Sequence, residues 1–218
     1  MTDAYLTLKE SASDEVIINK SRFIGYAAPV SSEEEALAFL QSIRQRHKEA
    51  NHHCYAYVIG TNAGIMRYSD DGEPGGTAGM PMIDFLKTKK LVNCIVVVVR
   101  YFGGVLLGTG GLVRAYTQGI KIAVEAAKII SMELTCIDEC EVAYSLWDKL
   151  KYEAASLPVQ IQNVRFASSV SFSLLTRSLD HETVLDALIR ITDGKIEYLP
   201  DEQRYMAWES EFLNFLYY

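Results

Sequence analysis

The residues best suited to chemistry lie between Val96 and Tyr116. A β-branched run at 95–99 predicts a strand buried on both faces, and a glycine-rich turn and a helical pattern follow it. A strand, a glycine loop and a helix start in this order direct free backbone N–H groups at an anion. Arg100 closes the strand, and Arg114 is expected in the first helical turn, where the helix dipole disfavours a cation. We therefore interpret Arg114 as facing a negative ligand or partner.

The glycine loop matches neither of the two common phosphate motifs. A Walker loop needs lysine and then serine or threonine after its last glycine, whereas Thr109 and Gly110 follow Gly108. The dinucleotide pattern needs a glycine three residues after Gly110, where this chain has Val113. Two interpretations stay open. Either the loop binds an anion, or its glycines only permit a tight turn between strand and helix.

A second polar segment, Ser69 to Pro81, contains three carboxylates. Asp70, Asp71 and Glu73 could together hold a hard cation. Their spacing is not that of a calcium-binding loop, and Asp and Gly are also favoured in turns for backbone reasons. The segment is therefore predicted to be a loop, with the three carboxylates kept as a candidate acidic site.

A third group, His52 to Cys54, has the side chains of a metal site but not its geometry. On a strand His52 and Cys54 share a side and His53 faces the other, and two ligands do not make a structural zinc site. No serine or cysteine lies in a recognisable nucleophile elbow. The sequence thus predicts no catalytic residue, no metal and no cofactor.

The overall composition is that of a globular protein, with 49% hydrophobic residues among 218 and a mean hydropathy of +0.04. No apolar run approaches the roughly 20 residues that span a membrane, and the N-terminus shows no signal peptide. Four cysteines without paired spacing indicate reduced thiols. We expect a cytoplasmic protein without a membrane contact.

The net charge of −7 is unevenly distributed along the chain. Residues 1–136 hold 14 Lys and Arg against 14 Asp and Glu, whereas residues 137–218 hold 7 against 14. A protein that coats nucleic acid would be basic overall. Any contact with RNA must therefore be local and must lie in the first part of the chain.

The first part of the chain is predicted to alternate strands and helices around the glycine loop. Strands are expected at 5–8, 16–18, 23–30, 53–59 and 95–99, with a hairpin turn at 11–14. Helices are expected from Ser31 or Ser32, where Glu34 and Glu35 complete capping boxes, at 82–88, and from the glycine loop to about residue 130. Tyr116 falls on the inward face of this last helix.

The second part is predicted to be a split βαβ, ferredoxin-like βαββαβ unit. Its elements are expected at 140–144, at 146–157 with a cap from Ser145 and Asp148, at 159–165, at 168–175, from Ser178 or Asp180 to Gly194, and at 196–208. These patterns define two expected domains, 1–134 and 135–218. The aromatic tail at 211–218 is expected to dock on its own domain.

The chain resembles the IMPACT/YigZ family in four ordered blocks, Ser21–Val30, His52–Gly60, Asp70–Met82 and Val97–Tyr116. The resemblance implies an α+β fold of two domains. The first would resemble domain IV of elongation factor G, a small-subunit ribosomal protein and GHMP kinases, and the second would resemble domain V of the same factor. Eukaryotic relatives regulate translation, and the resemblance implies a role of this chain at the ribosome or on structured RNA.

Taken together, these observations predict a translation-associated, non-catalytic protein that binds RNA, the ribosome or a translation factor. Arginines would pair with phosphate, backbone N–H groups would cap an oxygen, and an aromatic ring would stack on an unpaired base. The predicted anion- or RNA-binding residues are His53, Arg100, Tyr101, Gly104, Gly108, Thr109, Gly110, Gly111, Arg114 and Tyr116. Two alternatives stay open, a phosphate-handling enzyme that uses the glycine loop with Asp71 and Glu73, and a protein-interaction module. The oligomeric state is not predicted.

Overall fold

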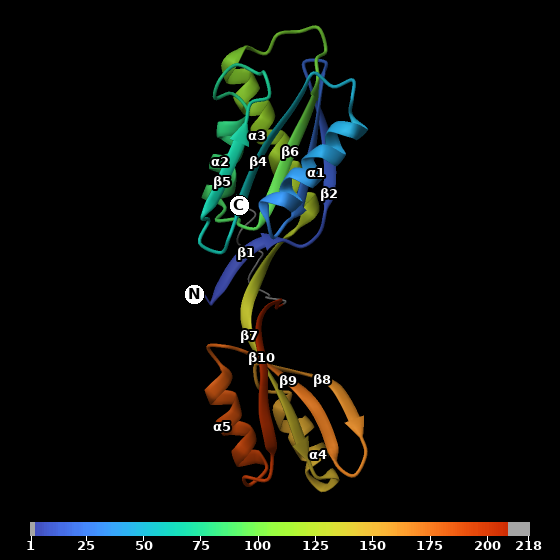
Figure 1. The fold of residues 1–218 in the computed structure, drawn as a ribbon, viewed down its shortest axis with the longest axis vertical. Coiled ribbons are helices and arrows are strands. Elements are labelled where there is room, and N and C mark those ends of the chain that lie inside the picture. The colour runs from blue at the N-terminus through green and yellow to red at the C-terminus, as the bar shows by residue number, and fades with distance from the viewer. Residues whose placement is uncertain (1–2, 209–218) are drawn as a thin grey trace. The chain divides into compact units, whose positions relative to one another are not determined.

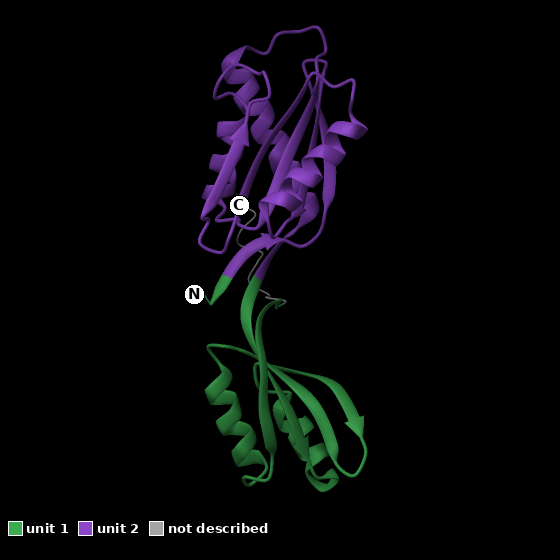
Figure 2. Ribbon diagram, in the orientation of Figure 1, with its two compact units in different colours: residues 1–4, 132–208 green, residues 5–131, 209–218 purple. Residues whose placement is uncertain are grey.

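The computed structural model describes residues 3–208, which form two compact units (Figures 1 and 2). Of the described residues, the larger unit contains 5–131, and the smaller unit contains 132–208 together with Asp3 and Ala4. The expected docking of the tail at 211–218 lies outside the described residues. No helix within residues 3–208 is long and apolar enough to cross a membrane.

The larger unit is built on an antiparallel sheet of five strands in the order β2–β3–β6–β4–β5. The strands are β2 (Ala12–Ile18), β3 (Ser21–Pro29), β4 (His52–Ile59), β5 (Ile65–Ser69) and β6 (Cys94–Tyr101). The predicted central strand is confirmed, because every side chain from Ile95 to Val99 is fully buried. The β-branched run is apolar on both sides because helices cover both faces of the sheet.

One helix covers one face of this sheet and two helices cover the other. The helices are α1 (Glu33–Arg46), α2 (Gly79–Thr88) and α3 (Gly108–Ala127). Helix α1 packs on the face of Ile24, Ile95 and Val97, whereas α2 and α3 pack on the opposite face with Val96 and Val98. Each face therefore has its own apolar core, and the two cores share the backbone of the sheet.

Two local features, of which the first was predicted, explain how these helices begin and pack. The capping box is confirmed at Ser32, whose hydroxyl accepts from the Glu35 N–H, while the Glu35 carboxylate accepts from the N–H of Ser31. Helix α3 lies unusually close to β3, where a Cβ on Gly25 would come within 2.1 Å of the Gly119 carbonyl oxygen. A glycine at position 25 is therefore required for this packing.

The structure corrects the predicted N-terminal hairpin. The hairpin turn lies at Asn19 and Lys20, whose φ values of 45° and 66° are those of a type I′ turn, and not at 11–14. Strand β1 (Ala4–Leu8) pairs with β7 (Ile129–Val142) instead of with β2. Helix α3 ends at Ala127, so residues predicted as helix end or linker are strand β7.

The smaller unit has the predicted ferredoxin-like order β7–α4–β8–β9–α5–β10. Its remaining elements are α4 (Tyr144–Ala154), β8 (Val159–Phe166), β9 (Val170–Arg177), α5 (His181–Ile191) and β10 (Glu197–Ala207). The antiparallel sheet runs β10–β7–β9–β8, and both helices pack on one face of it. The predicted cap by Ser145 and Asp148 is wrong, because α4 begins at Tyr144 and its N-cap Ala143 has no side-chain acceptor.

Candidate binding site at the loop end of the larger unit

Several connections of the larger unit meet at one end of its sheet, which we call the loop end. In the strand register Arg22 pairs with Tyr101, and His52 pairs with Arg100. The end of β6 therefore lies beside the starts of β3 and β4. Strand β5 runs antiparallel to β4 and also finishes there. The loop end consists of the turn 19–20, the segment 46–51, the loop 70–78 and the loop 102–107 with the start of α3.

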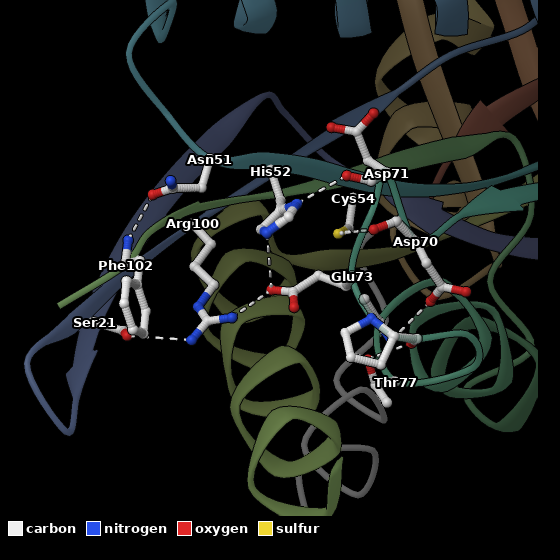
Figure 3. A network of polar contacts seen from close by, with 12 residues as sticks. Ser21, Asn51, His52, Cys54, Asp70, Asp71, Glu73, Thr77, Arg100 and Phe102 are labelled. Carbon is white, nitrogen blue, oxygen red and sulfur yellow. Dashed lines mark hydrogen bonds and ion pairs between the residues drawn. The ribbon is translucent and has the colours of Figure 1, made fainter. Parts of the chain in front are cut away.

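Glu73 lies at the centre of the loop end and is only 8% exposed. Its Oε1 accepts a hydrogen bond from Arg100 Nη1 at 2.7 Å, and His52 Nε2 lies 3.9 Å away (Figure 3). The same oxygen also accepts from the Tyr116 hydroxyl at 2.7 Å. The other terminal nitrogen of Arg100 reaches the hydroxyl of Ser21 at 3.4 Å. All four sequence blocks that carry the family resemblance thus meet around one buried carboxylate.

Asp70 closes the loop 70–78 onto the start of α2. Its Oδ1 accepts from the N–H groups of Ala78 and Gly79 at 2.9 and 2.8 Å, and its Oδ2 accepts from the Gly76 N–H at 2.9 Å. Burial by itself would raise the pKa of Asp70, but these three hydrogen bonds favour the charged form, and the pKa is lowered overall. The anion site at the N-terminus of α2 is therefore occupied by a side chain of the protein itself.

Asp71 holds the same loop against α1 and β4. Its Oδ1 accepts from Arg44 Nη2 at 3.1 Å, and its Oδ2 accepts from the backbone N–H of His53 at 2.7 Å. Its φ of 44° lies in the left-handed region, which Asp tolerates better than most residues. The three carboxylates of the candidate acidic site therefore point to three different sets of partners, and they do not converge on one cation.

His52 and Cys54 face this loop from β4. The Asp71 carbonyl can only accept, so the 2.8 Å contact places a proton on His52 Nδ1. The Cys54 thiol donates to the Asp70 carbonyl at 3.0 Å. Burial raises the pKa of the Cys54 thiol and also that of the Tyr116 hydroxyl, so both groups stay protonated at neutral pH.

The structure corrects the predicted roles of Arg100 and Tyr116. Arg100 is 6% exposed and its charge is paired with Glu73, so it is not available to a phosphate group. The Tyr116 ring is fully buried, with the Phe23 ring packed edge-on against it at 5.4 Å, so it is not available to a base. Both side chains build the interior under the loop end.

The predicted stacking role of His53 is corrected for a similar reason. The side chain is 12% exposed, and its Nε2 donates to the His47 carbonyl at 3.0 Å. His47 in turn bridges the hydroxyl groups of Tyr26 and Tyr101, at 2.6 and 2.9 Å. Burial lowers the pKa of His47. Tyr101 is half-buried and keeps part of its ring at the surface.

Most residues of the glycine loop lie at the surface. Helix α3 begins at Gly108, its N-cap Leu107 offers no side-chain acceptor, and its first turn holds no acidic residue. Gly104, Gly108, Thr109 and Gly110 are exposed, and Gly111 is half-buried. The first N–H groups of a helix have no partner within the helix. The start of α3 therefore presents unpaired donors at the loop end, as an anion site requires.

Arg114 is exposed, but it does not lie in the first helical turn. It is the seventh residue of α3, and this places it in the second turn. The unfavourable interaction with the helix dipole is confined to the first turn. The dipole argument for a negative ligand at Arg114 is therefore weaker than the sequence indicated, although its exposed position leaves the side chain available.

Two groups of exposed residues lie on the segments of the loop end, and Arg114 is the one member of these groups that the sequence predicted as a site residue. One is apolar and lies in the loop before α3, where Phe102 is 46%, Val105 39% and Leu106 87% exposed. The other is basic and comes from separate segments, namely Lys20, Arg46, Lys48 and Arg114, all exposed. Within residues 3–208, none of these four cations forms an ion pair with a carboxylate. They lie on segments that are distant in the sequence, and the strand register places the strand ends beside these segments at the same end of the sheet.

Metal-ligating groups are separated in the described part of the chain. Within residues 3–208, no three or more His, Cys, Asp and Glu side chains gather so as to hold a metal ion. The thiols of Cys54, Cys94, Cys136 and Cys140 are free and buried. Burial also raises the pKa of Cys94 and Cys140, each to about 12.

Comparison with known proteins places these observations in a family. The Impact N-terminal domain matches residues 19–124, and a domain of unknown function, DUF1949, matches residues 140–195. The IMPACT family member YvyE of Bacillus subtilis is 35% identical over 206 residues, which cover 94% of this chain and 95% of that protein. The IMPACT family member YigZ of Escherichia coli is 49% identical over 108 residues, which cover 49% of this chain and 53% of that protein.

A solved structure matches almost the whole length of this chain. It is a crystal structure of a hypothetical protein with 30% sequence identity and a TM-score of 0.60, and the match covers 93% of this chain and 99% of that one. The matched regions include all four sequence blocks around Glu73 and continue through the ferredoxin-like unit. This chain therefore belongs to the IMPACT family.

Proposed function

We propose that this protein is a translation-associated, non-catalytic binding protein of the cytoplasm that contacts RNA through the loop end of its larger unit. The observation that carries the proposal is that four exposed cations, an exposed aromatic ring and an uncapped helix start all lie on segments at the loop end. Cations and free N–H groups bind phosphate, and an exposed ring stacks on an unpaired base. RNA with single-stranded loops combines both features.

Each part of the loop end has a role in this proposal. Lys20, Arg46, Lys48 and Arg114 neutralise phosphates, and the N–H groups at the start of α3 cap a phosphate oxygen. Phe102 replaces the buried Tyr116 as the stacking ring, with the half-buried Tyr101 beside it in the chain. The network around Glu73 supports the surface from below, because the charge of Arg100 holds the loop 70–78 in place.

The family supports a role in translation, and the site supports binding more than chemistry. Relatives named Protein IMPACT or its homologue include proteins of Xenopus laevis and Saccharomyces cerevisiae, 34% and 36% identical over about half of this chain or less. The carboxylates that an enzyme would use, Asp71 and Glu73, are occupied by Arg44, His53 and Arg100. We therefore prefer a binding protein to a phosphate-handling enzyme.

A salt titration with a hairpin RNA that carries an unpaired loop tests the proposal. Four phosphate contacts, at roughly 0.7 each for single strands, give a log–log slope of about 3. Phe102→Ala should weaken binding by about 1–3 kcal/mol if one base stacks on the ring. Arg114→Ala should weaken binding by about 0.2–1 kcal/mol and reduce the slope by about 0.7.

Lys121→Ala is the matched control, because Lys121 lies on the same helix about 20 Å from its start and pairs with Glu125. It should leave RNA affinity unchanged. Equal losses in Lys121→Ala and Arg114→Ala would remove the loop end from the proposal. Undetectable binding at low salt, where electrostatic attraction is strongest, would exclude RNA as the partner.

We also propose 1–134 and 135–218 as the two functional domains. The first carries the RNA site, and the second carries the excess negative charge. A fragment of residues 1–134 should bind the hairpin RNA at least as tightly as the whole chain, because the acidic part repels phosphate. Limited proteolysis should yield two protected pieces that meet between residues 131 and 139. A single protected core without a cut in that region would contradict independent domains.

A further inference from the structure

Helices cover one face of the sheet of the smaller unit. Within residues 3–208 no helix packs on the other face, which we call the open face, although Ile137 and Leu175 on it are buried. Helices α4 and α5 cover the face that carries Cys140, Val142 and Phe172. Side chains alternate along a strand, so Glu139 and Glu141 of β7 point to the opposite face. Both glutamates are exposed. The open face is therefore acidic where it crosses the centre of the sheet.

The strand register adds a third glutamate to this face. Glu197 of β10 lies directly opposite Glu141, and Leu199 lies opposite Glu139. Residues directly opposite each other in an antiparallel pair have Cβ atoms about 4.5–5.5 Å apart, and like charges in such a pair destabilise the sheet. The chain thus keeps two carboxylates at a register position where opposite charges would be favourable.

The hydrogen-bond partners of these carboxylates among the described residues are serine hydroxyls, not cations. Glu139 accepts from the Ser173 hydroxyl at 2.7 Å, and Glu141 accepts from the Ser169 hydroxyl. Within residues 3–208, none of the three glutamates pairs with a lysine, arginine or histidine. The glutamates line a hollow of about 310 Å³ together with Ser171 and Leu199. This volume is at the lower end of the roughly 300–1,000 Å³ of ligand sites.

We propose that this open face is a docking surface for an extended polypeptide segment rich in lysine or arginine. Charge complementarity selects the sign of the partner, because three carboxylates that pair with no cation among the described residues attract cations and repel nucleic acid. The spacing selects an extended chain. Glu139 and Glu141 are two residues apart on one strand, about 6.4–6.8 Å along it, and alternate side chains of an extended peptide repeat at the same distance.

The borders of the face fit the same partner. Leu199 is 70% exposed beside Glu139 and offers apolar contact to the methylene groups of a lysine or arginine side chain. Arg165 of β8 lies opposite Ser171 and limits the acidic surface on that side. The proposal is independent of RNA binding, because it concerns residues of the smaller unit only.

Fluorescence anisotropy with the full-length protein tests the surface. The probe is a short labelled peptide in which lysine alternates with threonine, and the comparison peptide has glutamine in place of each lysine. The lysine peptide should bind, and the glutamine peptide should not. The triple variant Glu139→Gln, Glu141→Gln, Glu197→Gln should bind the lysine peptide about tenfold more weakly.

The matched control removes the same number of charges from the helices on the other side of this unit. Asp148→Asn, Glu153→Gln, Asp186→Asn changes three exposed acids and should alter affinity less than twofold. If the triple variant folds poorly, Glu197→Lys serves as a second test variant. It creates an opposite-charge pair with Glu141, so it should fold at least as well as the parent chain and still lose the peptide.

Three outcomes would overturn the proposal. Equal binding of the lysine and glutamine peptides would show that charge is not recognised. Equal loss in the triple variant and in the helix control would show an effect of net charge alone. Binding of spermine at this face, with no binding of the lysine peptide, would assign the surface to a small polyamine.

Discussion

The two units of this protein treat a buried carboxylate in opposite ways. In the larger unit the charge of Glu73 meets Arg100, and its Oε1 also accepts from Tyr116. In the smaller unit Asp138 is 1% exposed, its Oδ2 has no hydrogen-bond donor, and its nearest cationic partner is His181 at 3.5 Å. Burial raises the pKa of Asp138 in spite of His181. A buried carboxylate stays charged where the fold supplies hydrogen-bond donors and an opposite charge.

This difference links the sequence blocks to structure. The partners of Glu73 come from β4, β6 and α3, and Ser21 of β3 contacts Arg100, so the four sequence blocks meet around one charge. Asp138 lies between β9 and β10, and the first residue of α5, His181, is its ion-pair partner among the described residues. Glu73 is therefore hydrogen-bonded by residues of several elements of the larger unit, whereas Asp138 is a buried carboxylate of the smaller unit with one oxygen that has no hydrogen-bond donor.

Removal of Glu73 should produce the largest effect. Glu73→Ala leaves the Arg100 charge buried and unpaired, and breaking a buried ion pair in this way costs about 3–5 kcal/mol. Chemical denaturation should show a loss of this size in the free energy of unfolding. Glu49→Ala, at an exposed glutamate, is the control and should stay within about 0.5 kcal/mol of the parent chain. A loss below 1 kcal/mol in Glu73→Ala would mean that Arg100 finds another partner.

Removal of Asp70 should have the next largest effect, because it deletes the cap of α2. Asp70→Ala leaves three backbone N–H groups without their acceptor and should cost about 1–2 kcal/mol. The pKa of Asp70 is lowered in the fold, so its charge stabilises the protein above the ordinary pKa, and this stabilisation is lost as the pH falls through the lowered value.

Two variants separate the cap from a general loss of charge. Asp70→Asn keeps an acceptor oxygen and should recover part of the stability of Asp70→Ala. Asp84→Ala, at an exposed residue of the same helix that pairs with Lys87, should cost no more than about 0.5 kcal/mol. If Asp70→Ala and the parent chain lose stability in parallel between pH 5 and pH 3, the cap is not the cause.

Among the predictions from local sequence patterns, some are confirmed, whereas the hairpin turn at 11–14 and the cap by Ser145 and Asp148 are wrong. The β-branched run predicted the buried strand β6, and the Ser32 and Glu35 pair predicted the start of α1. The predicted position of the hairpin turn is wrong because the type I′ turn at Asn19 and Lys20 lacks the glycine that usually marks such a turn. Lys20 adopts a positive φ where the sequence carries no signal for it.

The site was predicted less well, because it depends on contacts between distant segments. The segment around Glu73 has the composition of a turn, and nothing within it indicates that one carboxylate is buried. The sequence predicted both an inward helical position and a base-stacking role for Tyr116. The ring is fully buried, which agrees with the inward position. The exposed cations Lys20, Arg46 and Lys48 lie on distant segments that the register of an antiparallel sheet places at the same end, and sequence periodicity does not specify that register.

Neutralisation of Asp138 should stabilise the protein modestly. Since its pKa is raised in the fold, protonated Asp138 stabilises the native state below the ordinary value near 3.9, and that stabilisation is lost as the pH rises through the native pKa. Asp138→Asn cannot ionise, so its advantage over the parent chain should appear as the pH rises above about 4. At pH 7 it should be of the order of 1 kcal/mol or less, a part of the cost of an unsatisfied buried group.

Unfolding measured from pH 4 to pH 7 checks this sign. The same comparison in a His181→Asn background separates Asp138 from the titration of the neighbouring imidazole. A destabilised Asp138→Asn at pH 7 would mean that His181 and Asp138 form a stabilising pair, and the contrast with Glu73 would then disappear.

The smallest effect is expected from Glu197, at the surface of the same unit. Glu197 lies directly opposite Glu141, so Glu197→Gln removes a like-charge pair and should raise the free energy of unfolding by about 0.2–1 kcal/mol. Salt screens exposed charges, so the gain should shrink at 1 M salt. Glu153→Gln, on the exposed side of α4, removes one charge without an opposed partner and should show no such gain. If Glu197→Gln is instead less stable than the parent chain at low salt, an unrecognised cation already holds Glu141 and Glu197 together. The negative charge of the open face would then be paired with a cation, as the charge of Glu73 is paired with Arg100.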